Sequence, residues 1–184
     1  MRRIISGFLF LVMMASVAQG TTMLALSLKE LTDNADAVVI GRCTGKRVFK
    51  SGNMIYTEYI IQVEETIKGS VGRELKVVQP GGELGGKGVR VSGVARLSLQ
   101  EDALLFLEKE NQGHRGIVGW SQGKFHIYYD EQSKKKYARQ ELDGLGFAKR
   151  GSGEVAAAKA EKLELEKLKT EVRALAAQDK GVRK

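Results

Sequence analysis

The hydrophobic pattern of residues 54–67 constrains the fold most, because its apolar side chains recur at every second position. One alternating face carries Ile55, Tyr59, Ile61, Val63 and Ile67, and the other carries Glu58, Gln62 and Glu64. A side-chain period of two is typical of a half-buried β-strand. Residues 37–49 are rich in Val and Ile, and the short segment 50–53 predicts a hairpin loop between the two strands.

Further strand patterns follow along the chain. Residues 103–107 form a continuous apolar run, which predicts a buried central strand. The other predicted strands are residues 74–79, 116–120, 123–130 and 135–140, with short strand-like pieces at 89–91 and 94–97. The body of the protein is therefore expected to be built from strands.

Two helices are expected at the ends of this body. Ser27 is a good N-cap, and Glu30 three residues later completes a capping box for a short helix that ends near Asn34. In the last third, apolar residues recur at steps of three and four, as on one face of a helix: Leu165, Leu168, Val172 and Leu175. This pattern predicts a helix over residues 154–180 that lies on the barrel or tethers the protein to a partner.

The first 20 residues have the pattern of a secretory signal peptide. A positive start at residues 1–3 precedes an apolar run at 4–17, and small residues follow. Cleavage between Gly20 and Thr21 fits this pattern, as does cleavage after Ala18. Because no other segment is long and apolar enough to span a bilayer, the expected product is secreted or periplasmic, with no transmembrane span after signal removal. The alternative is that the segment stays uncleaved as a membrane anchor.

These patterns predict a mainly β fold: a small, OB-like, partly open antiparallel β-barrel with a short N-terminal helix and a C-terminal helix. The expected organisation is a signal peptide at 1–20, the barrel domain at 21–140, a linker at 141–153 and a basic helix at 154–180. Cys43 is the one cysteine, so no internal disulfide can form. Its place in a strand pattern indicates a small buried hydrophobic residue rather than a reactive thiol.

Charge is unevenly distributed along the chain. Residues 21–133 hold 14 basic and 14 acidic residues, whereas residues 134–184 hold 14 basic and 8 acidic ones. A neutral body with a basic tail favours contact with an anionic partner such as lipid headgroups, acidic polysaccharide or an acidic protein. The alternative is a tail that only keeps the protein soluble.

A glycine-rich segment at 81–88 matches the first seven positions of a phosphate-binding P-loop. The eighth position, which should be Ser or Thr, is Gly88, and a strand pattern rather than a helix follows. Nucleotide binding is therefore not expected. Because loops between strands often carry binding function, the segment is a candidate recognition loop, represented by Gly81, Gly82, Glu83 and Lys87.

No catalytic, cofactor-binding or metal site is expected. The histidines, His114 and His126, have no Cys or carboxylate at metal-ligand spacing, and no Gly-x-Ser-x-Gly motif is present. An enzyme would require the fold to bring together groups such as His126, Glu83 and Lys87.

A basic cluster at Lys134, Lys135 and Lys136 is the second candidate contact site. Tyrosines flank it at positions 128, 129 and 137. A sheet face that combines aromatic rings and cations can stack bases or sugars, although nucleic acid is not an expected partner of an exported protein. The alternative is a solvated strand end.

An ordered series of short motifs covers residues 24–130. Its members are Leu24-x-Leu-Ser-Leu28-x-x-Leu31, Ala35-Asp36-x-Val-Val-x-Gly41, Ile55-Tyr56-Thr57, Val63-x-x-x-x-Lys68-Gly69, Pro80-Gly81-Gly82, Val91-x-Gly93, Leu104-Leu105-Phe106-Leu107 and Gly119-x-x-Gln122-Gly123-Lys124-Phe125. This series resembles a group of small exported bacterial proteins of unknown function. The resemblance brings no known activity with it.

The opening at residues 35–41 and the Lys68-Gly69 pair are also similar to netrin-like domains, including the tissue inhibitors of metalloproteinases. This similarity implies an OB-type five-stranded barrel. Those inhibitors place an N-terminal cysteine amine on the zinc of their target, but residues 21–23 contain no cysteine. The zinc-chelating mechanism therefore does not carry over.

The expected function is that of an exported, non-catalytic binding module without a cofactor, whose partner is a protein, including a peptidase, or an anionic envelope component. One alternative is a structural envelope protein attached through its basic C-terminal helix. Another is a hydrolytic enzyme with an unrecognised site.

Overall fold

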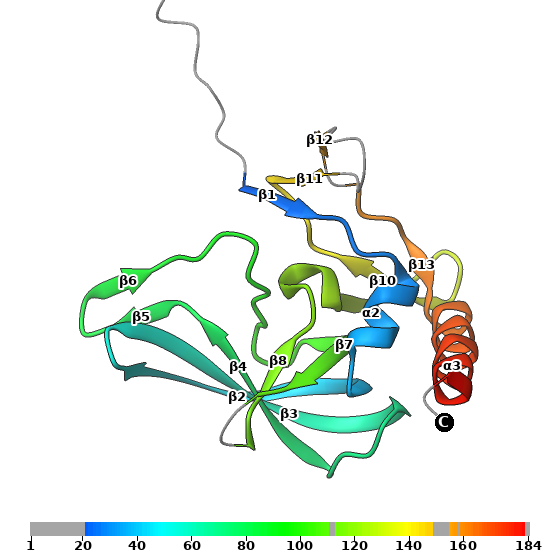
Figure 1. Ribbon diagram of the computed structural model, residues 1–184, viewed down its shortest axis with the longest axis horizontal. Helices are drawn as coiled ribbons and strands as arrows, with labels where there is room; N and C mark the ends of the chain where they lie inside the picture. Colours follow the sequence, from blue (N-terminus) through cyan, green and yellow to red (C-terminus); the bar gives the residue numbers. More distant parts are fainter. Residues whose placement is uncertain (1–20, 111–112, 149–154, 158, 183–184) are drawn as a thin grey trace, which may run out of the picture.

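The computed structural model describes residues 21–110, 113–148, 155–157 and 159–182, and its fold is mainly β with two α-helices. The expected small barrel with a short N-terminal helix and a C-terminal helix is confirmed (Figure 1). Among the described residues, no helix combines the length and apolarity that crossing a bilayer requires. The predicted signal peptide lies outside the described residues.

Five strands form the barrel: β2 (Ala37–Ser51), β3 (Met54–Lys68), β4 (Glu74–Pro80), β7 (Asp102–Lys109) and β8 (Arg115–Ile117). They pair in the order β2-β3-β4-β8-β7, and β7 also pairs with β2, so the sheet closes on itself. The β4–β8 pairing is parallel and the other pairings are antiparallel. This arrangement is a five-stranded barrel of the OB type.

A second layer extends from β7. The first part of β7 pairs with β9 (Lys124–Asp130), and the sheet continues through β10 (Lys135–Gln140) to β13 (Leu163–Glu164). Strands β2 and β7 therefore separate two hydrophobic cores, which explains why their sequences are continuously apolar.

The two cores use alternate residues of the shared strands. Val39 and Leu105 face the barrel interior, where the buried core also includes Cys43, Tyr59, Ile61, Leu75, Val77, Ala95, Leu97, Ala103, Leu107 and Ile117. Val38 and Phe106 face the outer core, whose other buried members include Leu31, Ile40, Leu104, Phe125, Ile127, Leu165, Leu168 and Val172. Cys43 is fully buried, and this burial raises the pKa of its thiol.

Both helices pack on the outer core. Helix α2 (Leu28–Asn34) begins with the expected capping box, in which Ser27 and Glu30 bond reciprocally. Helix α3 (Leu165–Val182) buries Leu168 and Val172 and lies against α2, β3 and β10.

The predicted helix over residues 154–180 was wrong at its start. Strand β12 (Val155–Ala157) and strand β13 precede α3, which begins only at Leu165. Alanine and glutamate favour helix in isolation. Here backbone pairing with neighbouring strands decides their conformation, because β12 pairs with β11 (Leu145–Ala148) and β13 pairs with β10.

A small separate sheet joins distant parts of the chain. Strand β1 (Thr21–Leu24) pairs in parallel with β11, in the segment where the sequence predicts a linker. The linker expected at 141–153 is therefore partly strand, and residues 149–153 lie outside the described part. The strand-like piece at 94–97 belongs to no strand, although Ala95 and Leu97 are buried in the barrel core.

Candidate functional site

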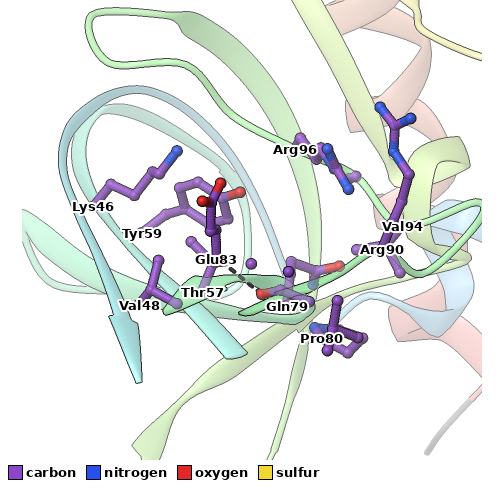
Figure 2. Close-up of a pocket in the computed structure, with 15 residues that line it drawn as sticks. Lys46, Val48, Thr57, Tyr59, Gln79, Pro80, Glu83, Arg90, Val94 and Arg96 are labelled. Carbon is purple, nitrogen blue, oxygen red and sulfur yellow. Dashed lines mark hydrogen bonds between the residues drawn. The ribbon is translucent and has the colours of Figure 1, made fainter. Parts of the chain in front are cut away.

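A cavity of about 490 Å³ lies at the mouth of the barrel. Its floor is the inner face of β2, β3 and β4, and its cover consists of two further segments. One is the hairpin of β5 (Gly82–Leu84) and β6 (Lys87–Val89), and the other is the segment 90–96 that crosses back toward β7 (Figure 2). The cavity is thus formed where the barrel is covered by loops rather than by paired strands.

Buried polar side chains line the floor of this cavity. Thr57, Tyr59 and Gln79 are each at least nine-tenths buried. The Tyr59 hydroxyl bonds to the backbone of Leu97, and burial raises the pKa of this phenol. The floor therefore combines apolar surface with groups that can orient a ligand.

Gln79 offers an acceptor to this floor. Its Nε2 donates a hydrogen bond to the Val78 carbonyl at 2.9 Å. This contact fixes the orientation of the amide, because the opposite orientation would place two carbonyl oxygens together. The buried Oε1 atom has no hydrogen-bond partner among the described residues, so the floor holds one unsatisfied acceptor.

Glycines allow the hairpin to approach the floor. Thr57 Oγ1 donates to the Gly81 carbonyl at 2.8 Å, and the Gly81 amide donates to the Ile55 carbonyl at 2.7 Å. A Cβ atom at Gly82 would lie 2.7 Å from Thr57 Oγ1 and 2.9 Å from a methyl group of Val48, and the φ of Gly82 is +140°. Glycine is required here by close packing and by its backbone conformation.

The rim of the cavity is charged. Lys46, Arg90 and Arg96 are exposed cations, and Glu83 is the acidic residue among the lining side chains. None of these four forms an ion pair with another described residue. Figure 2 shows Lys46 and Glu83 on one side of the cavity and the two arginines on the other. The rim therefore has a net positive charge available to a ligand.

The structure places most of the predicted recognition loop at this cavity. Gly81, Gly82 and Glu83 line it, whereas Lys87 lies on the same hairpin but outside the lining. The segment that resembles a P-loop opens a β-hairpin and no helix, as the sequence predicts from the residues that follow it.

The predicted basic contact at Lys134, Lys135 and Lys136 has a different surrounding. Lys134 pairs with Glu131 at 2.9 Å, and Lys135 pairs with Glu164 at 3.1 Å. All three lysines are exposed. Two of the three charges in this cluster are therefore partnered within the protein.

Lys162 lies against the rings of two tyrosines beside this cluster. Its ammonium lies 3.9 Å from the ring centre of Tyr137 and 6.0 Å from that of Tyr128, and it also bonds to Asp130. That hydrogen bond, together with a backbone amide from Ser133, holds the pKa of Asp130 at about 2. These rings already have a cation in contact with them.

The basic helix likewise meets carboxylates of the barrel. Lys169 pairs with Glu65 at 2.9 Å, and Arg173 also pairs with Glu65. Part of the positive charge in the last third of the chain is therefore paired with a carboxylate of the barrel.

A buried ionic cluster on the other side of the crossing segment was missed by the sequence analysis. Lys124 is 2% exposed and reaches Glu101 at 2.6 Å, Glu141 at 2.7 Å and the carbonyl of Arg96. Glu101 also lies 3.2 Å from Nδ1 of His126. A lysine in a half-apolar strand is ordinarily an exposed residue, so the sequence carries no local signal for this cluster.

Glu83, Lys87 and His126, which the sequence analysis named as an example of a catalytic set, do not share one cavity. Glu83 lies at the barrel mouth, Lys87 lies outside the cavity lining, and His126 lines a separate surface pocket on β9 and β10. Within the described ranges, no group of three or more His, Cys, Asp or Glu side chains is arranged to hold a metal ion.

No protein-family model matches the chain, and no curated protein matches it.

Proposed function

We propose that this protein is an exported, non-catalytic binding module that recognises an anionic partner at the barrel-mouth cavity. The observation that carries this proposal is the rim, where Lys46, Arg90 and Arg96 have no carboxylate partner among the described residues. Arg42, Lys124 and Lys162 are examples of cations that do have such partners, and the rim is distinguished by three cations without one around a single cavity. The proposed partner supplies the missing negative charge.

The floor supports binding rather than catalysis. Thr57 and Tyr59 are bonded to backbone groups of the protein, and Gln79 presents a neutral acceptor. Such groups orient a ligand but do not supply a nucleophile with an adjacent base. The rim attracts the partner, and the floor receives the part of it that enters the barrel.

Reversing charge at the rim is expected to weaken recognition strongly. The variant Arg90→Glu/Arg96→Glu should lose a partner captured from native envelope or culture supernatant by residues 21–184, because the new carboxylates repel an anion. Capture should weaken by at least about tenfold, which corresponds to about 1.4 kcal/mol. Quantitative mass spectrometry of the captured proteins, glycans and lipids is the measurement.

Lys87→Glu provides a control for one of the two charge reversals, and each single variant, Arg90→Glu and Arg96→Glu, is compared with it. Lys87 is exposed and lies on the covering hairpin, next to the segment that carries Arg90 and Arg96, but it does not line the cavity. It changes the net charge in the same direction without touching the site. An equal loss of capture in the control would mean that the loss comes from the change in net charge and not from the cavity. Full retention of the partner by the double variant would exclude the cavity as the recognition site.

A further inference from the structure

Strand β2 has two edges that differ in pairing. One edge pairs with β3 along the length of the strand, from Val38 to Ser51. The other pairs with β7 only over Ala37–Arg42. Next along this edge, Cys43 bonds to the backbone of residues 100 and 101. After Cys43, residues 46–51 have no strand partner on this outer edge in the described part of the chain. The barrel is therefore open along this edge.

The orientation of the free backbone groups follows from the register. The Gly81 amide bonds to the Ile55 carbonyl, so the backbone of Ile55 is directed toward β4. Ile55 lies opposite Lys50 on β2, and the backbone groups of Lys50 therefore point away from β3. Since orientation alternates along an antiparallel strand, Lys46 and Val48 also direct their N–H and C=O groups outward.

This open edge borders the barrel-mouth cavity. Lys46 and Val48 form one wall of the cavity, and Arg90 and Arg96 lie on the opposite wall (Figure 2). A strand laid along the outer edge of β2 would enter the gap between these walls. Alternate side chains of that strand would then face the cavity, because successive strand residues point to opposite faces.

Charge decides which strand fits there. The edge carries Lys46, Arg47 and Lys50, of which Arg47 pairs with Glu58 at 3.1 Å. A second copy of the same edge would bring like charges opposite one another, which disfavours pairing between two copies of the chain. An acidic segment would meet cations both on β2 and across the cavity.

We propose that the partner binds as an extended acidic peptide segment that pairs with the outer edge of β2, as an additional strand, between this edge and the crossing segment. The inference rests on the proposed function, because it uses the same cavity and rim. Outward groups of Lys46, Val48 and Lys50 supply the backbone hydrogen bonds, and the rim cations bind the alternate acidic side chains. Backbone pairing gives affinity, and the side-chain pattern gives specificity.

The first test uses peptides of alternating Glu and Thr, long enough to lie along residues 44–51, titrated into the protein (residues 21–184) by calorimetry. Two further peptides have the same sequence with N-methyl groups on alternate residues, on the Glu residues in one and on the Thr residues in the other. Each therefore lacks the backbone N–H donors along one of its two edges. A fourth peptide replaces Glu with Lys. The unmodified peptide should bind, one methylated peptide should bind at least about tenfold more weakly, and the Lys peptide should not bind.

The second test changes the protein. Val48→Pro removes the outward N–H while leaving the bonds to β3 in place, since proline is tolerated where a strand edge faces solvent. Val48→Thr is the control, and thermal unfolding checks that both variants are folded. Affinity for the Glu–Thr peptide should be at least about tenfold lower in Val48→Pro than in Val48→Thr, which changes the same side chain but keeps the backbone donor.

The outcomes separate the two proposals. Equal binding of the unmodified peptide and both methylated peptides, or absence of binding by the unmodified peptide, would overturn strand addition. Under the first of these results, the cavity would remain an anion site if the rim variant Arg90→Glu/Arg96→Glu still lost its partner. Retention of the partner by that rim variant would contradict the proposed function itself.

Discussion

Replacing Leu168 with Ala is expected to lower the free energy of unfolding by about 2–5 kcal/mol, the usual cost of removing a fully buried leucine side chain. Leu168 is 2% exposed and belongs to the outer core with Phe106 and Val172. The loss should appear as a lower urea midpoint with an unchanged slope. The result would establish that the basic helix is part of the folded body.

Lys167→Ala is the control on the same helix. The side chain of Lys167 is 81% exposed, and alanine favours helix, so this change should alter stability by no more than about 0.5 kcal/mol. If Leu168→Ala behaved like Lys167→Ala, α3 would not be packed on the barrel. A chain ending at residue 153 should fail to fold, because it lacks the core side chains of α3.

Removing the buried ammonium of Lys124 is expected to be comparably severe. Lys124→Met leaves Glu101, whose side chain is 7% exposed, without its closest cation. Breaking a buried pair on one side typically costs about 3–5 kcal/mol, because an uncompensated charge remains inside the protein. Glu141 contributes less to this cost, since its side chain is 60% exposed.

A double-mutant cycle with Glu101→Gln measures the coupling energy between Lys124 and Glu101 apart from their contacts with other groups. Glu101→Gln removes the charge that Lys124→Met would leave uncompensated and retains an acceptor for the Ser98 amide. The double variant should therefore lose less stability than the sum of the two single variants, by about 1 kcal/mol or more. Additive losses would mean that Lys124 and Glu101 are not coupled.

The barrel strands and the first helix could be predicted because their signals are local. Alternation in residues 54–67 and the capping box at Ser27 each specify an element without reference to the rest of the chain. The pairing of β1 with β11 could not be predicted, because it joins residues 21–24 to residues 145–148 in parallel and leaves no local pattern. The start of α3 was misplaced for the same reason.

The candidate site was predictable only in part. Glycines at 81 and 82 marked a loop with special backbone requirements, and three of the four named recognition residues line the cavity. The rim cations were missed because Lys46 lies on β2 and Arg90 and Arg96 lie on the distant crossing segment, and neither stretch carries a local sequence signal for a shared site. The open edge of β2 depends on where β7 begins opposite Arg42, and this register is set by tertiary packing.

The most direct test of the account is residue-resolved NMR of the folded protein, residues 21–184, during titration with the Glu–Thr peptide. The account predicts the largest amide shifts at Lys46–Lys50 and Arg90–Arg96, with slowed hydrogen exchange at the outward amides of Lys46, Val48 and Lys50. Lys134–Lys136 and α3 should change little. Shifts confined to those basic segments, with the barrel mouth unchanged, would contradict the assignment of recognition to the cavity.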